Sequence, residues 1–250
     1  MEKQQVICKV PEVTLIFWII KIVATTLGET GGDAVSMSMN LGYLISTGIF
    51  LVIFILAVGV QISAKNFHPV LYWATIVATT TVGTTLADFA DRSLGIGYVG
   101  GTAILFTLLM ASLFIWYRTL GSISIDTVSS PKSEIFYWVT IMFSQTLGTA
   151  LGDWTADTAG LGYSGGAIVF SAMLLAIAAA YYWTKISHVA LFWAAFILTR
   201  PLGAVVGDYL DKPISEGGLE LSRYSASAAL IAFIVFCIFF FSHKPASQAH

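Results

Sequence analysis

The segment WIIKIVATTLGETGGD, from Trp18 to Asp33, decides the fold because the chain repeats its frame three more times. The other copies are WATIVATTTVGTTLAD (73–88), WVTIMFSQTLGTALGD (138–153) and WAAFILTRPLGAVVGD (193–208). In every copy a glycine stands ten residues after the tryptophan, and an aspartate stands five residues after that glycine. A tyrosine follows in all copies, as Tyr43, Tyr98, Tyr163 and, after a six-residue insertion, Tyr224. The chain therefore contains a fourfold internal repeat.

Composition indicates that these repeats lie in a membrane. The chain is 57% hydrophobic and 10% charged, with a mean hydropathy of +0.83, whereas about a quarter of the residues of a soluble domain are charged. A span needs about 20 apolar residues to cross about 30 Å of hydrocarbon. We expect eight spans, at residues 12–33, 41–63, 69–88, 97–118, 134–153, 162–184, 188–208 and 222–242. The sequence therefore predicts an all-α integral membrane protein with eight transmembrane helices.

A soluble helical protein with a large core is the alternative to this prediction. The surface helices of such a protein carry charged outer faces. Residues 49–60 and 228–241 contain no charged side chain, so neither segment has a face suited to water. The membrane interpretation is favoured.

The repeats also predict how the chain is organised. Each repeat holds two spans, so successive repeats enter the membrane from the same side, as tandem parallel helical-hairpin repeats. The tryptophans lie 55, 65 and 55 residues apart, and the longer interval holds a polar, serine-rich linker. We expect repeats 1 and 2 (spans 1–4) in residues 12–120, a cytoplasmic linker in 121–132, and repeats 3 and 4 (spans 5–8) in 133–242.

Lysine and arginine predict the orientation of the spans. The side that holds the termini and the linker carries Lys3, Lys9, Lys65, Arg118, Lys132, Lys185 and Lys244. The opposite side carries Arg92, Lys212 and Arg223. Because positive residues accumulate in cytoplasmic loops, we expect both termini in the cytoplasm.

The motif glycines predict close helix packing. Gly28 is followed four residues later by Gly32, and the third and fourth copies repeat this GxxxG spacing. Small residues at this spacing let helix backbones approach each other in lipid. We therefore expect the four motif helices to pack tightly near their non-cytoplasmic ends. The motif tryptophans are typical of anchors at the membrane interface.

Acidic residues are concentrated in the motifs, which hold eight of the 14 in the chain. They form the pairs Glu29/Asp33, Asp88/Asp91, Asp153/Asp157 and Asp208/Asp211. A spacing of three or four residues places both carboxylates of a pair on one helix face, about 5–6 Å apart. Acids at such depth usually face the bundle interior or a water-filled path. We expect the four common aspartates to lie at one level, near the non-cytoplasmic face.

These eight acids are candidate metal ligands. Carboxylate oxygens suit hard divalent cations such as Mn²⁺, Mg²⁺ and Ca²⁺, and no Cys or His joins the motifs. The competing interpretation makes the acids structural anchors, neutralised by Arg92, Lys212 and Arg223. It suits the outer acids best, since Asp91 and Asp211 each precede a basic residue in the sequence.

Two basic residues, Lys21 and Arg200, lie inside spans one and seven. Buried cations need partners, and the motif carboxylates are the available ones. Glu29 lies about 12 Å along the helix axis from Lys21, too far for its side chain to reach. We therefore expect the partner of Lys21 to come from another repeat or from water. The sequence leaves open whether this lysine is an exchangeable cation or a fixed counter-ion.

Four tandem two-span units, each with a tryptophan and a glycine–aspartate phrase, resemble a bacterial membrane-protein family described as a repeat of unknown function. The resemblance covers residues 12–242 and implies a multi-pass protein of the bacterial inner membrane. The fourth copy departs from the pattern, with Pro201 in place of a threonine and an inserted loop at 212–220. The acid-and-glycine phrase GETGGD is also similar to the paired acidic motifs of small manganese and calcium exporters.

We expect a membrane transporter for a cation, most of all a divalent metal such as manganese, coupled to ion or proton exchange. The alternative is a membrane sensor or scaffold whose acidic motifs are structural. An enzyme ranks below both, because no nucleophile–base set, HExxH motif or phosphate-binding loop is present. The absence of a basic patch excludes nucleic acid as a partner. The expected partners are membrane lipid and a small cation, and the sequence leaves open a homo-oligomer.

Overall fold

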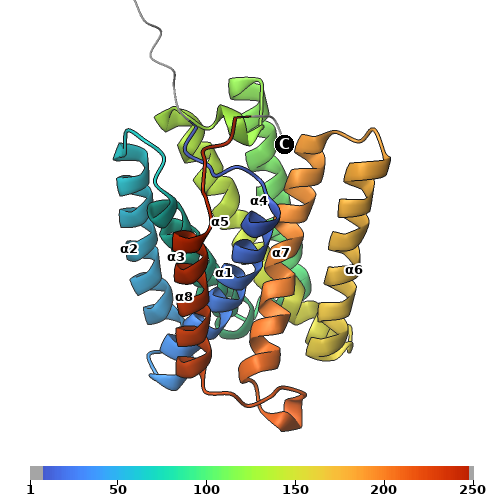
Figure 1. Cartoon of the computed structure of the whole chain (residues 1–250). Coiled ribbons are helices and arrows are strands. Elements are labelled where there is room, and N and C mark those ends of the chain that lie inside the picture. The colour runs from blue at the N-terminus through green and yellow to red at the C-terminus, as the bar shows by residue number, and fades with distance from the viewer. Residues whose placement is uncertain (1–7, 248–250) are drawn as a thin grey trace, which may run out of the picture.

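The structure is a computed structural model that describes residues 8–247; Lys3, which entered the charge count, lies outside them. Its long helices are α1 (Leu15–Asp33), α2 (Gly42–Ser63), α3 (Pro69–Asp88), α4 (Gly97–Leu120), α5 (Pro131–Asp153), α6 (Gly162–Trp183), α7 (His188–Asp211) and α8 (Arg223–Phe240) (Figure 1). Within the described residues the only β pairing is an isolated bridge between Pro11 and Pro245. The predicted all-α class is confirmed.

Seven of these helices are long and apolar enough to cross a membrane. The exception is α5, which has 23 residues but carries the buried polar residues Thr140, Ser144 and Gln145 in its central part. At about 1.5 Å per residue its length is sufficient, so its polarity sets it apart. The molecule is a membrane protein built of apolar helices.

Short turns join the two helices of each repeat. After α1, α3 and α5 the chain forms the π-helical turns η1 (Ala34–Ser38), η2 (Phe89–Ser93) and η4 (Trp154–Thr158). The next helix then begins at Gly42, Gly97 or Gly162, whose φ angles are 73°, 74° and 65°. L-residues with a side chain rarely adopt such angles, so glycine is required at these equivalent positions. In the fourth copy α7 continues to Asp211, and the insertion follows with the 3₁₀ turn η5 (Ile214–Glu216).

The four odd-numbered helices form a closed inner ring, in which α1 packs on α3, α3 on α5, α5 on α7, and α7 on α1. Most residues of α3 are buried, whereas the buried residues of α2 are only Ser46, Thr47 and Gln61. The even-numbered helices therefore lie outside the ring. Figure 1 shows α2 and α6 at opposite edges of the bundle.

Each outer helix packs on the inner helix of the following repeat. Thus α2 lies on α3, α4 on α5, α6 on α7, and α8 closes the circle on α1. The predicted helical hairpins are not confirmed as packed units, because the helices of one repeat separate to contact the next repeat. Thr30 of α1 and Ser227 of α8 share a hydrogen bond of 2.8 Å at the closing contact.

Aromatic residues fill one end of the ring. Phe17 occupies the position eleven residues before the motif glycine, which the other repeats fill with Tyr72, Tyr137 and Phe192, and all four are buried. The hydroxyls of Tyr72 and Tyr137 are 2.6 Å apart. Three motif tryptophans, Trp73, Trp138 and Trp193, are also buried in this core. The interpretation of these three as anchors at the membrane interface is therefore wrong, because their rings are buried in the core of the bundle.

The described ends of the chain meet over the aromatic end of the ring. The amide of Glu12 donates to the carbonyl of Lys244 (2.8 Å), and the amide of Lys9 donates to the carbonyl of Val128 in the linker (3.1 Å). The Lys9 ammonium forms a 2.7 Å ion pair with Glu134. Burial raises the pKa of the Cys8 thiol to about 11. Both terminal segments and the linker thus lie on one side of the bundle.

Candidate acidic site

The motif glycines set the register of the inner ring. A Cβ atom on Gly28 would collide with Thr80, on Gly83 with Gln145, on Gly148 with Arg200, and on Gly203 with Thr25. Each glycine thus contacts the next helix three residues before the glycine of that helix. A Cβ on Gly83 would lie 3.0 Å from backbone atoms of α5. The expected close packing of the motif helices is confirmed, and the same contact recurs around the whole ring.

This register brings the four common aspartates together at the end opposite the aromatic residues. Arg92 joins two of them, with its Nε 3.1 Å from Asp88 Oδ1 and its Nη2 3.3 Å from Asp153 Oδ2. Lys212 joins the other two, with its Nζ 2.5 Å from Asp33 Oδ2 and 3.2 Å from Asp208 Oδ1. These four buried carboxylates form what we call the aspartate ring. The prediction that they lie at one level agrees with these contacts.

The two bases occupy equivalent positions, nine residues after the motif glycines of repeats 2 and 4. Each base pairs with the aspartate of its own repeat and with that of the next repeat. Burial alone would lower the pKa of Lys212, but Asp208 and Asp33 raise it well above its usual value. Lys212 is therefore a permanent cation. The aspartate ring is bridged at two of its four gaps and not at the gaps between Asp33 and Asp88 or between Asp153 and Asp208.

The outer acids behave differently from one another. Asp211 accepts a 3.1 Å bond from Arg223, and the exposed Asp157 accepts a 3.2 Å bond from Tyr98. Asp91 is buried, and neither of its oxygens has a hydrogen-bond partner among the described residues. The interpretation that Arg92 and Lys212 neutralise the outer acids beside them is wrong. Each base instead contacts the common aspartate one helical turn before it, Arg92 with Asp88 and Lys212 with Asp208.

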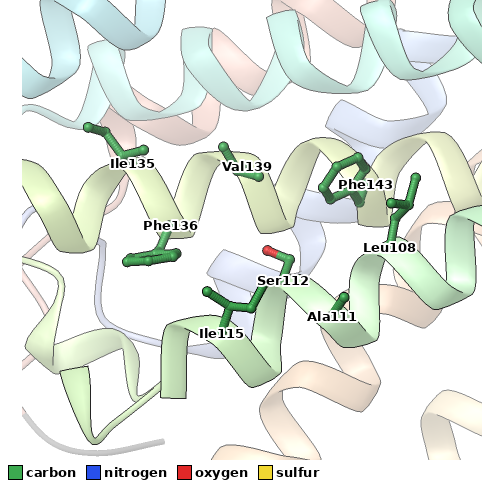
Figure 2. Close-up of a pocket in the computed structure, with 8 residues that line it drawn as sticks. All are labelled: Leu108, Ala111, Ser112, Ile115, Ile135, Phe136, Val139 and Phe143. Atoms are coloured by element: carbon green, nitrogen blue, oxygen red, sulfur yellow. The ribbon is translucent and has the colours of Figure 1, made fainter. Parts of the chain in front are cut away.

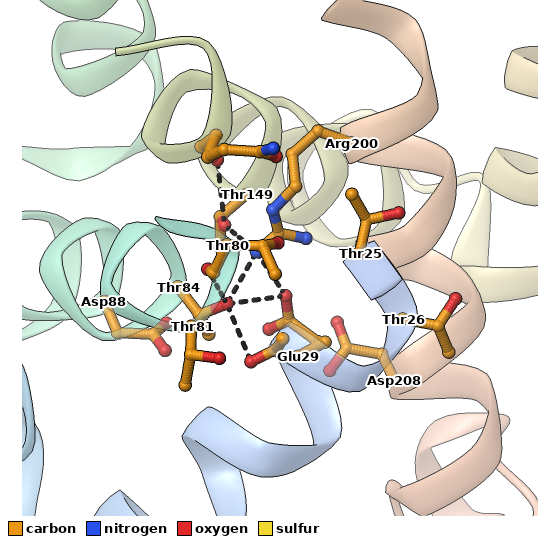
Figure 3. A network of polar contacts seen from close by, with 12 residues as sticks. Thr25, Thr26, Glu29, Thr80, Thr81, Thr84, Asp88, Thr149, Arg200 and Asp208 are labelled. Atoms are coloured by element: carbon orange, nitrogen blue, oxygen red, sulfur yellow. Dashed lines mark hydrogen bonds and ion pairs between the residues drawn. The ribbon is translucent and has the colours of Figure 1, made fainter. Parts of the chain in front are cut away.

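Arg200 and Glu29 meet in the centre of the ring (Figure 3). The Arg200 Nη2 group donates to Glu29 Oε2 at 2.9 Å and to Thr84 Oγ1 at 2.6 Å, and it also donates to Thr149. Glu29, Thr84 and Thr149 each follow a motif glycine directly, so they lie at one level. One side chain of repeat 4 thus contacts the other three repeats. A motif carboxylate is the partner of Arg200, as predicted.

Lys21 has a different environment. Its ammonium donates to Thr199 Oγ1 at 3.3 Å and lies 4.1 Å from the centre of the Phe196 ring. Among the described residues no carboxylate forms an ion pair with it. The expectation of a partner from another repeat is confirmed. The expectation of a motif carboxylate is wrong, because Glu29 is held one layer away by Arg200.

Two groups of three buried acids have carboxylate oxygens within 4.8 Å of one another: Glu29, Asp33 and Asp88, and Asp33, Asp208 and Asp211. Three predicted ligands, Asp91, Asp153 and Asp157, belong to neither group. In the first group the ion pairs use Glu29 Oε2, Asp33 Oδ2 and Asp88 Oδ1. The second oxygen of each acid is left out of those pairs. The second group instead encloses Lys212, which bridges two of its members.

The grooves on the outside of the bundle are not ion sites. One, of about 250 Å³, lies between α4 and α5; its only polar side chain, Ser112, is bonded to Thr140 at 2.6 Å (Figure 2). A second, of about 480 Å³, lies among α1, α2, α3 and α8 and has no acidic lining residue. Both are apolar surfaces suited to lipid chains. The acids Glu29, Asp33 and Asp88 are buried and line neither groove.

The sequence analysis named Arg92 and Lys212 as bases that neutralise motif acids, but it did not predict that each base bridges the common aspartates of two repeats. The signal was present, because both stand four residues after a common aspartate, in alternate repeats. That spacing places base and acid on one helix face. What could not be read from it was the second partner of each base, which belongs to the next repeat in the ring.

The fold and the site define a class: a helical membrane protein made of four tandem two-helix repeats that close around a buried ring of acids. The model of the family described as Repeat of Unknown Function (DUF347) matches residues 16–67, 71–122, 136–187 and 191–244. The chain belongs to this family. No curated protein and no solved structure matches it.

Proposed function

We propose that this protein is a membrane transporter for a hard divalent cation such as Mn²⁺. The observation that carries the proposal is the group Glu29, Asp33 and Asp88, with three buried carboxylates whose oxygens lie within 4.8 Å of one another. Like charges so close repel unless they bind protons or a cation. Oxygen ligands from three acids suit Mn²⁺, Mg²⁺ and Ca²⁺.

The oxygens left out of the ion pairs support this choice of site. Asp33 Oδ1 is buried and has no hydrogen-bond partner among the described residues. A buried carboxylate oxygen without a partner is costly. A cation bound by Glu29, Asp33 and Asp88 would give this oxygen a partner and remove that cost.

The position of the site supports transport. It lies at the mouth of a ring whose axis is lined by threonines, among them Thr79, Thr84 and Thr149, which are fully buried. Intramembrane acids that face a bundle interior commonly mark ion and proton pathways. Protons that replace the metal on the same carboxylates supply the coupling in the proposed exchange.

The proposal includes the topology. α5 completes the inner ring between α3 and α7, which supports an eighth span despite its polarity. The excess of lysine and arginine beside the termini and the linker supports cytoplasmic termini. The family resemblance supports the bacterial inner membrane as the location.

A scaffold or sensor is the second candidate, and one observation favours it. Every aspartate of the ring already has a cation partner, with Arg92 and Lys212 each joining two repeats. Such bridges fix the arrangement of the four repeats whether or not a metal binds.

Manganese uptake into proteoliposomes distinguishes the two candidates. Asp88→Asn and Asp153→Asn form a matched pair, because both aspartates are buried and both contact Arg92. Only Asp88 belongs to the three-acid group. We expect Asp88→Asn to lower Mn²⁺ affinity at least ~10-fold, and Asp153→Asn to have a clearly smaller effect. A pH-sensitive dye inside the vesicles should report a rise in internal pH during wild-type uptake, because protons leave the vesicle as Mn²⁺ enters.

Two outcomes would contradict the proposal. If folded wild-type protein neither binds nor moves Mn²⁺, Mg²⁺ or Ca²⁺, transport of a divalent cation is wrong. If Asp88→Asn and Asp153→Asn alter uptake equally, the three-acid group is not the site. Thermal unfolding of each variant should be recorded beside uptake, so that misfolding is not taken for loss of transport.

A further inference from the structure

Two cations are buried on the aromatic side of the aspartate ring. The side chains of Lys21 and Arg200 have no exposed surface. Glu29 compensates the charge of Arg200 through their ion pair. Lys21 has only a hydroxyl and an aromatic ring beside it, from Thr199 and Phe196. Among the described residues, no carboxylate therefore forms an ion pair that would compensate the charge of a protonated Lys21.

The same layer contains hydrogen-bonding groups without partners. Among the described residues these are the Nε and Nη1 of Arg200, both side-chain amide atoms of Gln145, and the hydroxyls of Ser144 and Thr80. All four side chains are fully buried. Buried polar atoms nearly always have a partner in the protein or in bound solvent. Apart from Gln145 Oε1, which can only accept, these atoms can donate hydrogen bonds, so the group points to a ligand that accepts them.

The repeat register places these donors close together. Ser144 and Thr199 both stand four residues before a motif glycine, and Thr80, Gln145 and Arg200 stand three residues before one. The Lys21 ammonium reaches this level through its bond to Thr199. The register thus places donor-bearing residues of α3, α5 and α7 at adjacent levels of the ring, next to the level that the Lys21 ammonium of α1 reaches. The carboxylates lie toward the other end, beyond Arg200.

We propose that this layer binds a small monovalent inorganic anion of the size of chloride. Such an anion neutralises the charge of Lys21 and accepts hydrogen bonds from the Arg200, Gln145, Ser144 and Thr80 donors. A cation does not suit the layer, because the side chains of Lys21 and Arg200 present hydrogen-bond donors to it and no carboxylate pairs with Lys21. A carboxylate ligand would bring an apolar body into a layer lined by donors on every inner helix.

The anion site goes beyond the proposed transport of a divalent cation and does not depend on it. It also bears on that function, because a cation that moves along the ring axis meets Lys21 and Arg200. A bound anion lowers the electrostatic barrier at this layer. The two proposals use different residues, so each can fail alone.

Thermal unfolding of the purified full-length protein tests the anion site. Sodium chloride is compared with sodium gluconate at equal ionic strength, because gluconate is too large for the layer. A ligand that binds only the folded state stabilises it by mass action, so the unfolding temperature should rise and saturate with chloride. At about a hundred times the dissociation constant, the expected rise is about 5 °C. Bromide should act in the same way.

Variants locate the effect. Lys21→Met should remove the chloride-dependent rise, while in gluconate it should remain as stable as the wild type because it removes a buried charge. Gln145→Leu should weaken the rise. Lys65→Met, a change at an exposed lysine in the loop between α2 and α3, is the matched control and should keep the full rise. Direct binding of radioactive chloride to the same proteins gives a second measurement.

The proposal is overturned if chloride and gluconate give the same unfolding temperature for the wild type, since water would then fill the layer. It is equally overturned if Lys21→Met keeps the full chloride effect. Asp33→Asn separates the two proposals, because it removes a ligand of the proposed metal site and should leave the chloride-dependent rise intact. A lost metal response with a preserved chloride response therefore bears on the transport proposal alone.

Discussion

The gap between Asp33 and Asp88 and the gap between Asp153 and Asp208 occupy equivalent places in the two halves of the chain, and neither is bridged by a base. The first gap has Glu29 directly after its motif glycine, whereas the second has Thr149 at that position. Only the first contains three acids within 4.8 Å. The two halves of the chain thus share the arrangement of aspartates, but only the first half has the three-acid group. The residue directly after the motif glycine, Glu29 in one half and Thr149 in the other, makes this difference.

Arg200 pairs with Glu29, the acid that distinguishes the two gaps, and its replacement should cause the largest change in the free energy of unfolding. Arg200→Gln leaves Glu29 buried without its cation, so we expect a loss of about 3–5 kcal/mol in the free energy of unfolding. The double variant Glu29→Gln/Arg200→Gln should recover most of that loss, because no unpaired charge remains. Denaturant or thermal unfolding in detergent measures both, and Arg118→Gln, at an exposed site, serves as control. A double variant as unstable as the single one would break the link between the two residues.

The two bridging bases allow a second test, because they occupy equivalent positions but differ in burial. The Lys212 side chain is 8% exposed and that of Arg92 is 33% exposed. We expect Lys212→Met to cost about 3 kcal/mol and Arg92→Met, with better access to water, about 1 kcal/mol. Equal losses, measured by unfolding in detergent, would show that burial does not distinguish the two bridges.

The pH dependence follows from the raised pKa of Lys212. A base whose pKa is higher in the folded state stabilises that state fully below its unfolded value, here about 10.4. This stability is lost only as pH rises through the folded-state pKa. The difference between wild type and Lys212→Met should therefore stay constant from about pH 8 to 10. A fall within that window would contradict the assignment of Lys212 as a permanent cation.

The smallest expected effect comes from making the two gaps alike. Thr149→Glu places a third acid beside Asp153 and Asp208, and we expect a second Mn²⁺-binding event in calorimetry. Because an added buried charge costs desolvation, this event should be about 10-fold weaker than the first. Thr149→Gln has a similar size without the charge and should bind no additional metal. Identical titrations of the two variants would mean that Glu29 does not distinguish the gaps.

Most of the repeat architecture could be predicted from the sequence. Invariant intervals from Trp18 to Gly28 to Asp33 predicted both the repeat and the common level of the aspartates, because a fixed number of helical residues spans a fixed distance. The sequence could not predict side-chain contacts between different inner helices, because spacing within one helix does not say which helix is adjacent. The second contact of Arg92, with Asp153, is of this kind.

Two further features could not be read from composition. An apolar outer span such as α2 suits either inner helix beside it, so composition does not predict that it packs on α3. Trp73, Trp138 and Trp193 look like interfacial anchors by residue type, and only the closure of the ring shows that neighbouring helices bury them. The eight predicted metal ligands were reduced to the three acids Glu29, Asp33 and Asp88 for a similar reason. Lys212 bridges Asp33 and Asp208 of the other acidic group, and its contact with Asp33 exists only in the assembled ring.

The packing of each outer helix on the next repeat has a consequence for biosynthesis. Synthesis proceeds from the N-terminus, so α1 is made well before α8, the helix that packs against it. Until then one side of α1, with Thr30, lacks the contact that Ser227 provides in the finished ring. If repeats 1 and 2 were made alone, α1 would lack its contacts with α7 and α8, and α3 and α4 would lack their contacts with α5. The contact between α1 and α8 can therefore form only after α8 has left the ribosome.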